Sequence, residues 1–465
     1  MIIDQIYTGC LAQGAYYIQS EGEAAIIDPL REVSPYLKKA EENGAKIKYI
    51  FETHFHADFV SGHVTLAEKT GAPIVYGPTA NPSFEAHIAK DGEVFKLGKV
   101  SIKVLHTPGH TMESTTYLLI DEEGNETALF TGDTLFLGDV GRPDLAQKAA
   151  HMTQEELAGI LYESLRNKIM PLSDDIIVYP AHGAGSACGK NMMKETVDTL
   201  GNQKKMNYAL RADMTKAEFI KEVTDGLLPP PGYFPLNVKL NKEGYESIDK
   251  VLADGMKPLS PAEFEIIASE TEALMLDVRM PEDFAAGHIP NSIFIGLDSS
   301  FAPWVGELVV DVQQPIILIV PEGREEEAVT RLSRVGFDNT LGYLKGGIKA
   351  WKAANKETDT VTSVPATELK DVKAKIFDVR KQSEYLSEHV VDAENTPLGE
   401  INEHLAEFPK EEPFYLHCEG GYRSMIASSI LKSRGYHNLI DIQGGFNAIK
   451  ETDIPVSDYV CPTTL

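Results

Sequence analysis

The stretch that decides the fold is Thr53–Gly62, THFHADFVSG, which follows the apolar, β-rich run Ile47–Phe51. It places His54, His56 and Asp58 at alternate positions directly after a predicted strand. Strand ends are rigid and the loops after them are free to carry chemistry, so side chains there can converge on one ion. The stretch therefore predicts an α/β domain whose site lies at the ends of its strands.

Three further potential ligands follow other β-rich runs, each beside a small residue. His110 ends HTPGH, Asp133 ends FTGD and His182 lies in YPAHG. One histidine in such a place is more often structural, but several imidazoles and carboxylates at successive strand ends indicate a metal site. Short strands alternate with helical stretches from residue 3 to about residue 245, a pattern typical of an α/β sandwich.

The totals limit the class of protein. A chain of 465 residues with 43% apolar content has room for about three domains. The net charge of −27 has no compensating basic block, so neither nucleic acid nor a membrane surface is an expected partner. The start has no secretory leader pattern and no run is apolar for long enough to span a bilayer, so we expect a cytoplasmic protein. The four cysteines lie far apart, so any functional cysteine acts singly.

The second half of the sequence repeats itself. LDVRMPEDFAAGHIPNSIFIGL (Leu276–Leu297) is answered by FDVRKQSEYLSEHVVDAENTPLGE (Phe377–Glu400). VGFDNTLGYLKGGIKAW (Val335–Trp351) is answered by RGYHNLIDIQGGFNAI (Arg434–Ile449). The shared order of strand, D-V-R, H-I or H-V, strand, loop, helix, strand and G-G predicts two tandem α/β modules of roughly 100 residues. The Asp and Arg of each D-V-R motif are interpreted as structural.

The second copy carries a cysteine loop. In FYLHCEGGYRSMIASSILKSRG (Phe414–Gly435), Cys418 follows a short apolar strand and precedes two glycines and a helix. The glycines let backbone N–H groups turn inward, and the positive end of the helix dipole stabilises a thiolate or persulfide. Arg423 adds a cation for the oxygen atoms of sulfite or thiosulfate. Cys418 is therefore predicted to be a nucleophile.

The first copy lacks these features. In IILIVPEGREEEAVTRLSRVG (Ile316–Gly336), Pro321 lies near the cysteine position, the loop is predicted to be shorter, and the acidic run Glu325–Glu327 follows it. Neither the nucleophile nor an anion pocket is left, so this module is predicted to be catalytically silent. It is a candidate spacer, or a surface for self-association into a homo-oligomer.

The motifs resemble two known families. HFHADF, HTPGH, TGD and PAHG are similar to the ligand motifs of the metallo-β-lactamase fold, in the order found in glyoxalase II-like enzymes and persulfide dioxygenases. CEGGYRS is similar to the active-site loop of single-domain rhodaneses, and phosphatases that share this shape use a longer loop. The whole chain resembles the bacterial persulfide dioxygenase–rhodanese fusions of sulfide detoxification.

That resemblance implies a multidomain α/β fold. An αββα metallo-β-lactamase sandwich is expected at residues 1–245, a degenerate rhodanese-like domain at 255–355 and an active rhodanese domain at 362–465. It also implies that His54, His110 and Asp133 hold one Fe(II) per chain. Two imidazoles and one carboxylate that leave open positions suit non-haem iron, although the same ligands also suit zinc.

The remaining ligand types are expected to support this metal rather than bind it. By the same resemblance His56, Asp58 and His182 hold ligands or bound water by hydrogen bonds. The superfamily has a histidine at the position of Phe59, where it helps to hold a second metal. A phenyl ring has no lone pair and brings apolar bulk, so one metal is expected.

Three other residues are candidates for contact with substrate. Arg142, in GDVGRPDL, resembles a pocket arginine of the dioxygenases; the alternative is a surface arginine paired with a neighbouring aspartate. Cys188 is a redox-active thiol or an inert buried residue. Tyr233, in PPPGYFP (Pro229–Pro235), could close over a thiol carrier, but an interdomain connector is slightly favoured.

The implied chemistry couples two reactions. A low-molecular-weight persulfide is oxidised by O₂ to sulfite and thiol, and Cys418 passes sulfane sulfur to sulfite to give thiosulfate. The thiol carrier is open among coenzyme A, bacillithiol, glutathione and cysteine. Two alternatives stand: a zinc-dependent thioester hydrolase of the glyoxalase II type fused to a sulfurtransferase, and a non-enzymatic persulfide carrier or sensor that uses Cys418 alone.

Overall fold

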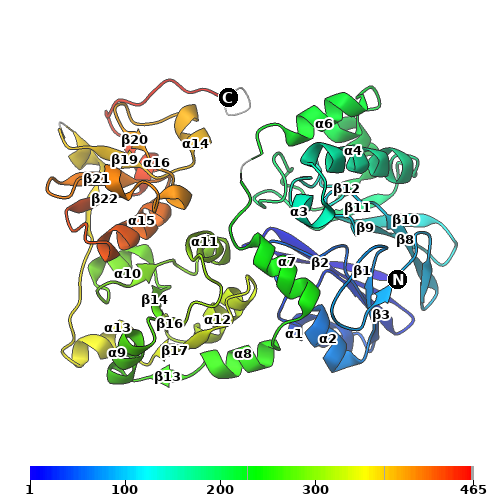
Figure 1. The fold of residues 1–465 in the computed structure, drawn as a ribbon, viewed down its shortest axis with the longest axis horizontal. Helices are drawn as coiled ribbons and strands as arrows, with labels where there is room; N and C mark the ends of the chain where they lie inside the picture. Colours follow the sequence, from blue (N-terminus) through cyan, green and yellow to red (C-terminus); the bar gives the residue numbers. More distant parts are fainter. Residues whose placement is uncertain (228, 371, 462–465) are drawn as a thin grey trace. The chain divides into compact units, whose positions relative to one another are not determined.

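The computed structural model describes residues 1–227, 229–370 and 372–461, so the end of the second predicted module, 462–465, lies outside it. The chain forms two compact units (Figure 1). Unit 1 comprises Met1–Lys250 with Leu332–Gly336, and unit 2 comprises Val251–Arg331 and Phe337–Leu465. No helix in the described ranges has both the length and the apolar character needed to cross a bilayer.

Unit 1 contains two six-stranded sheets. The first has the order β1(Ile2–Thr8), β2(Gln13–Ser20), β3(Glu23–Ile27), β4(Lys46–Phe51), β5(Ile74–Tyr76) and β6(His87–Ile88). The second has the order β12(Asp198–Thr199), β11(Ile177–Pro180), β10(Glu126–Gly132), β9(Thr115–Ile120), β8(Val100–His106) and β7(Val94–Leu97). Strands β3, β4, β5 and β6 run parallel to one another, and β10 is parallel to β11.

Alternation along the strands produces the layers of unit 1. In β2, Tyr16 and Ile18 point into a core shared with Tyr117 of the second sheet, whereas Ala15 and Tyr17 point to the outer face. Both faces of the strand are buried, so both must be covered, because successive side chains of a strand point to opposite sides. The α-sheet-sheet-α sandwich expected from the sequence is confirmed.

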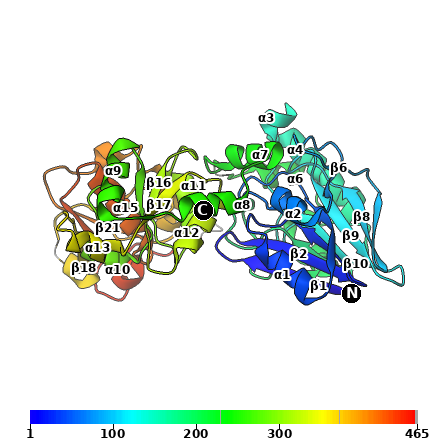
Figure 2. The ribbon, with the colours of Figure 1, turned by 90° about the horizontal axis from the view of Figure 1, so that it is seen from below.

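Helices cover the two outer faces. Helices α1(Ser34–Glu42) and α2(His63–Thr70) pack on the first sheet, and α4(Gln154–Ser164) with α6(Lys216–Thr224) packs on the second, as Figures 1 and 2 show. Helix α4 begins at a capping box between Thr153 and Glu156, and the π-helical turn η1(Leu165–Ile169) extends it. The other helical elements are α3(Gln147–Ala150), α5(Leu200–Met206), η2(Tyr208–Leu210), α7(Phe234–Glu243) and α8(Ile248–Gly255).

Unit 2 contains two five-stranded sheets with the same topology. The first module has the order β13(Pro258–Leu259), β17(Thr340–Leu344), β16(Ile316–Ile319), β14(Leu274–Asp277) and β15(Ile293–Phe294). The second has the order β18(Thr362–Pro365), β22(Leu439–Gln443), β21(Phe414–His417), β19(Ile376–Asp378) and β20(Glu394–Asn395). The strand pairings within both of these sheets are parallel. The repeat in the sequence is therefore a repeat of the fold.

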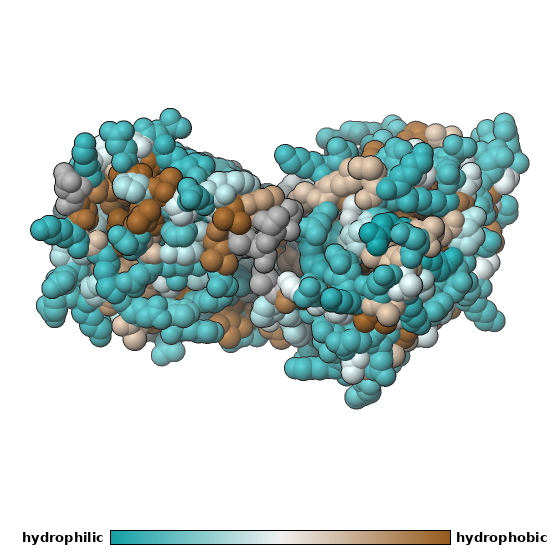
Figure 3. All heavy atoms as spheres, turned by 90° about the horizontal axis from the view of Figure 1, so that it is seen from above, coloured by the Kyte–Doolittle hydropathy of each residue, from teal (hydrophilic) through white to brown (hydrophobic). Residues whose placement is uncertain are grey.

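The helices of the two modules differ in two places. The first module has α9(Pro261–Glu270), α10(Pro281–Ala286), α11(Phe301–Leu308), α12(Glu325–Ser333) and α13(Gly347–Ala353). The second has η3(Ala366–Leu369), α14(Gln382–Ser387), η4(Leu398–Glu400), η5(Leu405–Glu407), α15(Tyr422–Ser433) and α16(Gly445–Ile449). The 3-10 turn η3 thus takes the place of α9, and the short 3-10 turns η4 and η5 take the place of α11. On the face drawn in Figure 3, most exposed residues are hydrophilic.

Candidate metal centre and cysteine loop

Three predicted ligands of unit 1 come together in one group. His54 follows β4 of the first sheet, whereas His110 follows β8 and Asp133 follows β10 of the second, so strand ends of both sheets position the three side chains. Their ligand atoms lie within 4.8 Å of one another and all three side chains are buried. Asp133 Oδ2 is 3.4 Å from His110 Nε2 and 3.9 Å from His54 Nε2.

The two imidazoles are turned so that Nε2 faces the carboxylate. Thr53 donates its hydroxyl and its backbone N–H to Asp28 at 2.8 Å, so its oxygen can accept from His54 Nδ1 at 3.0 Å. His110 Nδ1 lies 2.8 Å from the carbonyl oxygen of Arg142 and must donate to it. In each ring the proton is on Nδ1, which leaves the Nε2 lone pair for a metal.

The third group is the carboxylate of Asp133. Neither carboxylate oxygen of this buried side chain has a hydrogen-bond partner among the described residues. Buried polar atoms are nearly always satisfied, so two unpaired oxygens beside two oriented imidazoles fit a divalent cation. The residues present therefore suit the metal that the motifs predict.

A second group adjoins the first. The ligand atoms of His56, Asp58 and His182 also lie within 4.8 Å of one another, and all three side chains are buried. His182 Nε2 is 3.4 Å from Asp58 Oδ2 and 3.5 Å from Asp133 Oδ1. Asp133 therefore turns one oxygen toward each group. The Phe59 ring, fully buried, lies against the His56 ring with their centroids 4.3 Å apart.

His56 is also tied to two buried acids on its other side. Its Nε2 lies 3.0 Å from Asp28 Oδ1 and 3.6 Å from Glu52 Oε2. Burial lowers the pKa of His56, but attraction to Asp28 and Glu52 outweighs it and raises the pKa to about 9. This pairing supports the interpretation of His56 as a group that orients the site.

An asparagine that the sequence did not reveal holds the stretch Thr53–Gly62, called the metal loop below. Asn241, buried on α7, donates its amide to the carbonyl oxygens of His56 and Phe59, both at 2.8 Å. Its Oδ1 accepts from the backbone N–H of Ser61 at 2.8 Å. One side chain therefore satisfies three backbone groups of the loop.

The same helix corrects one prediction. Pro229–Pro235 lies inside unit 1, and its end enters α7, the helix that braces the metal loop. The interdomain-connector interpretation is therefore wrong. Tyr233 is buried next to Phe234, with ring centroids 5.1 Å apart. Its predicted contact with a thiol carrier stays a prediction.

Arg142 and Cys188 both lie beside the centre. Arg142 is buried, not at the surface, and its guanidinium binds Asp144 through two hydrogen bonds of 2.7 Å. Its backbone N–H donates to the carbonyl oxygen of Cys188 at 3.0 Å. The Cys188 sulfur lies within 4.8 Å of ligand atoms of Asp133 and His182. Burial, followed by the charges of nearby carboxylates, raises the pKa of this thiol well above its usual value.

In unit 2, Cys418 follows β21 and the loop turns directly into α15. Gly421 has φ +98°, a conformation that favours glycine, and its backbone N–H donates to Cys418 Sγ at 3.1 Å. Phe446 N–H donates to the carbonyl oxygen of Cys418 at 2.7 Å. A Cβ on Gly445 would lie 2.4 Å from that oxygen, which explains why this position is a glycine.

Charged partners surround the loop. Arg423 binds Glu384 through Nη1 and Nη2 at 2.6 and 2.8 Å, so its charge is shared with a carboxylate of its own chain. Arg380 is buried, pairs with Asp378 and reaches Glu419 of the loop at 3.0 Å. Arg380 and Asp378 thus fit the structural role predicted for D-V-R.

The first module differs from the prediction in two details. Ile319 and His417 each accept the N–H of the valine in their module's D-V-R motif, so Val320, and not Pro321, is the counterpart of Cys418. The loop is also not shorter, because residues 320–324 separate β16 from α12, whereas residues 418–421 separate β21 from α15. The expectation of a shorter loop is wrong. The acidic run Glu325–Glu327 does form the first turn of α12.

Comparison with known proteins places both units. Residues 8–182 match the Metallo-beta-lactamase superfamily, and residues 260–354 and 366–452 match the rhodanese-like domain. Human persulfide dioxygenase ETHE1, mitochondrial, is 29% identical over 221 residues, which are 47% of this chain and 78% of the human protein. The hydroxyacylglutathione hydrolase GloC of Haemophilus influenzae is 30% identical over 37% of this chain and 84% of its own length.

A solved structure covers more of the chain. A crystal structure of a metallo-β-lactamase from Staphylococcus aureus is 33% identical, has a TM-score of 0.65, and matches over 74% of this chain and 99% of its own. Both the sequence motifs and the paired sheets agree with these matches. The chain therefore belongs to the metallo-β-lactamase superfamily, with two rhodanese-like domains after the metallo-β-lactamase domain.

Proposed function

We propose that unit 1 is a persulfide dioxygenase that uses one Fe(II), and that the second rhodanese-like module is a sulfurtransferase. The group of His54, His110 and Asp133 carries the proposal, because each imidazole is held by Nδ1 and presents Nε2 beside an unpaired carboxylate. Two histidines and one carboxylate with open positions are the arrangement of non-haem Fe(II) oxygenases. The likeness to a persulfide dioxygenase supports the same activity.

The first reaction converts RSSH, O₂ and water into RSH, sulfite and two protons. Bound iron would supply positions at which the persulfide sulfur and O₂ meet. The chain supplies the rest: Thr53 and the Arg142 carbonyl fix the two imidazoles, and Phe59 fills the space beside His56 with apolar bulk. RSSH is a low-molecular-weight thiol persulfide.

The second reaction takes place at Cys418. A thiolate there accepts the terminal sulfur of a persulfide and becomes Cys–S–S⁻, releasing the donor thiol. Attack by sulfite on the outer sulfur then breaks the S–S bond, gives thiosulfate and returns the thiolate. The N–H of Gly421 stabilises the negative sulfur.

Metal analysis of anaerobically purified protein, combined with oxygen uptake on glutathione persulfide, tests the proposal. We expect about one iron per chain and persulfide-dependent uptake. Asp133→Ala should lose both but keep sulfur transfer from thiosulfate to cyanide. Asp213→Ala, an exposed aspartate of the same unit, is the matched control. Protein that holds only zinc and takes up no oxygen would contradict the proposal.

A second candidate function rests on different observations. The likeness to a hydroxyacylglutathione hydrolase and the second group of His56, Asp58 and His182 favour a zinc-dependent thioester hydrolase. Phe59 and the rhodanese-like modules weigh against it. Hydrolysis of S-lactoylglutathione by the zinc-loaded protein, without oxygen uptake, would establish this function instead.

A further inference from the structure

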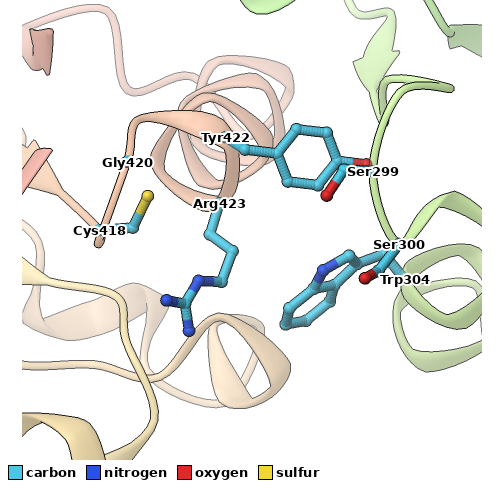
Figure 4. Close-up of a pocket in the computed structure, with 7 residues that line it drawn as sticks. All are labelled: Ser299, Ser300, Trp304, Cys418, Gly420, Tyr422 and Arg423. Carbon is cyan, nitrogen blue, oxygen red and sulfur yellow. The ribbon is translucent and has the colours of Figure 1, made fainter. Parts of the chain in front are cut away.

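The pocket in front of Cys418 is built by both rhodanese-like modules. Its volume is about 270 Å³. Its lining residues are Ser299, Ser300, Trp304, Cys418, Gly420, Tyr422 and Arg423. Figure 4 shows the cysteine loop and α15 on one side and the segment that carries both serines and the tryptophan on the other. Ser299, Ser300 and Trp304, called the wall below, therefore come from the module that has no nucleophile.

Hydrogen bonds fix the two modules to each other at this place. Tyr422 donates its hydroxyl to the carbonyl oxygen of Gly296 at 2.8 Å. The backbone N–H of Phe294 donates to Ser429 Oγ at 2.9 Å, and both groups are buried. Tyr422 and Phe294 also pack ring to ring with centroids 5.9 Å apart. The wall is thus a fixed part of unit 2.

The degenerate site of the first module holds the wall in place. Arg331, buried on α12, donates to the carbonyl oxygens of Leu297 and Ser299 at 2.5 and 3.0 Å. Arg324 pairs with Asp298 at 2.7 Å, and Glu327 binds both arginines. Helix α12 stands where α15 stands in the active module, so charged side chains on this helix and just before it hold the segment that lines the pocket.

The wall has a chemistry of its own. The serines offer two exposed hydroxyl donors and Trp304, partly buried on α11, offers a flat indole. Because Glu384 already binds Arg423 through both terminal nitrogens, hydroxyl donors are needed to complete the recognition of a second anion. A volume of about 270 Å³ lies just below the range of sites for drug-sized ligands.

We propose that Ser299, Ser300 and Trp304 of the silent module select the sulfur acceptor of Cys418, admitting a small sulfur oxyanion such as sulfite and excluding bulky thiols. The inference rests on the proposed sulfurtransferase function. The serines hydrogen-bond the oxyanion, and the indole limits the width of the entrance. The silent module is therefore part of the active site.

Steady-state sulfur transfer from glutathione persulfide to sulfite, and separately to dithiothreitol, tests this role. The double variant Ser299→Ala/Ser300→Ala should raise the KM for sulfite about tenfold, the loss expected for hydrogen bonds to an anion, with little change in kcat. Trp304→Ala should improve dithiothreitol as an acceptor relative to sulfite. Ser269→Ala, an exposed serine of α9, should change neither value.

Two further measurements separate the failure of this inference from the failure of the proposed function. Mass spectrometry of Cys418 should show one added sulfur in every variant; no loading in the unaltered protein would refute the sulfurtransferase itself. If Cys418 carries the added sulfur but the variants keep the native preference between sulfite and dithiothreitol, the role proposed for the wall is refuted. The chain has two tryptophans, and Trp351 donates its indole N–H to the backbone carbonyl oxygen of Glu357 inside the first module. Sulfite should therefore change the fluorescence of the native protein but not that of Trp304→Phe.

Discussion

The two rhodanese-like modules share one framework and differ in what stands at its centre. Both have the same order of five parallel strands and a buried D-V-R ion pair. Only the second has a cysteine whose sulfur accepts a backbone N–H. In the first, Val320 takes the cysteine position and α12 begins with acids. The fold of a module thus does not depend on its nucleophile. In the first module, Arg324 and Arg331 bind the segment that lines the pocket of the second.

The largest expected effect comes from exchanging the residue at the cysteine position. Cys418→Ser should abolish thiosulfate formation and leave sulfite production, because the nucleophile of the cysteine loop is lost. Adding Val320→Cys to that variant should restore nothing, since the acidic first turn of α12 opposes a thiolate. Thiosulfate and sulfite are measured by chromatography. Activity of the double variant would break the comparison between the modules.

The paired glycines give a matched test of the cradle. Gly445 and Gly347 have φ +55° and +56°, so alanine costs both about 1–2 kcal/mol of backbone strain. A Cβ on Gly445 would lie 2.4 Å from the Cys418 carbonyl oxygen, whereas the nearest atom to one on Gly347 is 3.9 Å away. Gly445→Ala should therefore lose most sulfur transfer and unfold at a lower temperature than Gly347→Ala. Equal losses would mean that the close approach is unimportant.

A smaller effect is expected at Arg423. Lysine keeps the charge but cannot bind Glu384 through two parallel hydrogen bonds, so Arg423→Lys should lower kcat/KM for sulfite about tenfold. Arg434→Lys, an exposed arginine just after α15, is the control. In the first module the acidic run Glu325–Glu327 occupies the helix start at which Arg423 lies in the second. The experiment therefore tests whether this difference separates the two modules. An unchanged kcat/KM would show that charge alone suffices.

The smallest effect concerns pH and an acid of the second module. Burial, against the hydroxyls of Ser424 and Ser363, raises the pKa of Asp441 to about 6. The folded state therefore holds this proton more tightly than the unfolded state, and stability falls as pH rises from about 4 to about 6. Asp441→Asn removes this loss. Its advantage in thermal unfolding over the native protein should grow by about 1–3 kcal/mol across that window.

If the difference in unfolding free energy between Asp441→Asn and the native protein stayed constant between about pH 4 and about pH 6, the raised pKa assigned to Asp441 would be contradicted. The first module provides the comparison, because Tyr343 occupies the position of Asp441 beside the central strand. Tyr343→Phe should therefore leave the pH dependence of unfolding as it is in the native protein.

The parts of both sites that depend on local order could be predicted from the sequence. His54, His110 and Asp133 could be found because each comes directly after an apolar strand, and the internal repeat determined the expected topology of unit 2. Cys418 was evident from its glycines and the helix after them. These signals span only a few residues each. Hydrophobic periodicity and turn residues are the features that can be read most directly from a sequence.

The parts that were missed depend on contacts over long separations or on backbone atoms. Asn241 braces His56 from 185 residues away, and the group on Arg142 that orients His110 is a carbonyl oxygen, which any residue has. The wall residue Trp304 belongs to a helix with no counterpart in the second module, so aligning the repeats gave no reason to select it. Pro229–Pro235 suggested a connector because prolines mark a break in regular structure, and they do not reveal that a helix of the same unit begins at its end.

The brace supplied by Asn241 has a practical consequence for dissecting the chain. The superfamily match ends at residue 182, and a fragment cut near that point would keep every predicted ligand. Such a fragment would lack the amide that joins His56, Phe59 and Ser61. An isolated unit 1 should therefore be expressed through Lys250, and a shorter fragment is expected to bind metal weakly although its predicted ligands are intact.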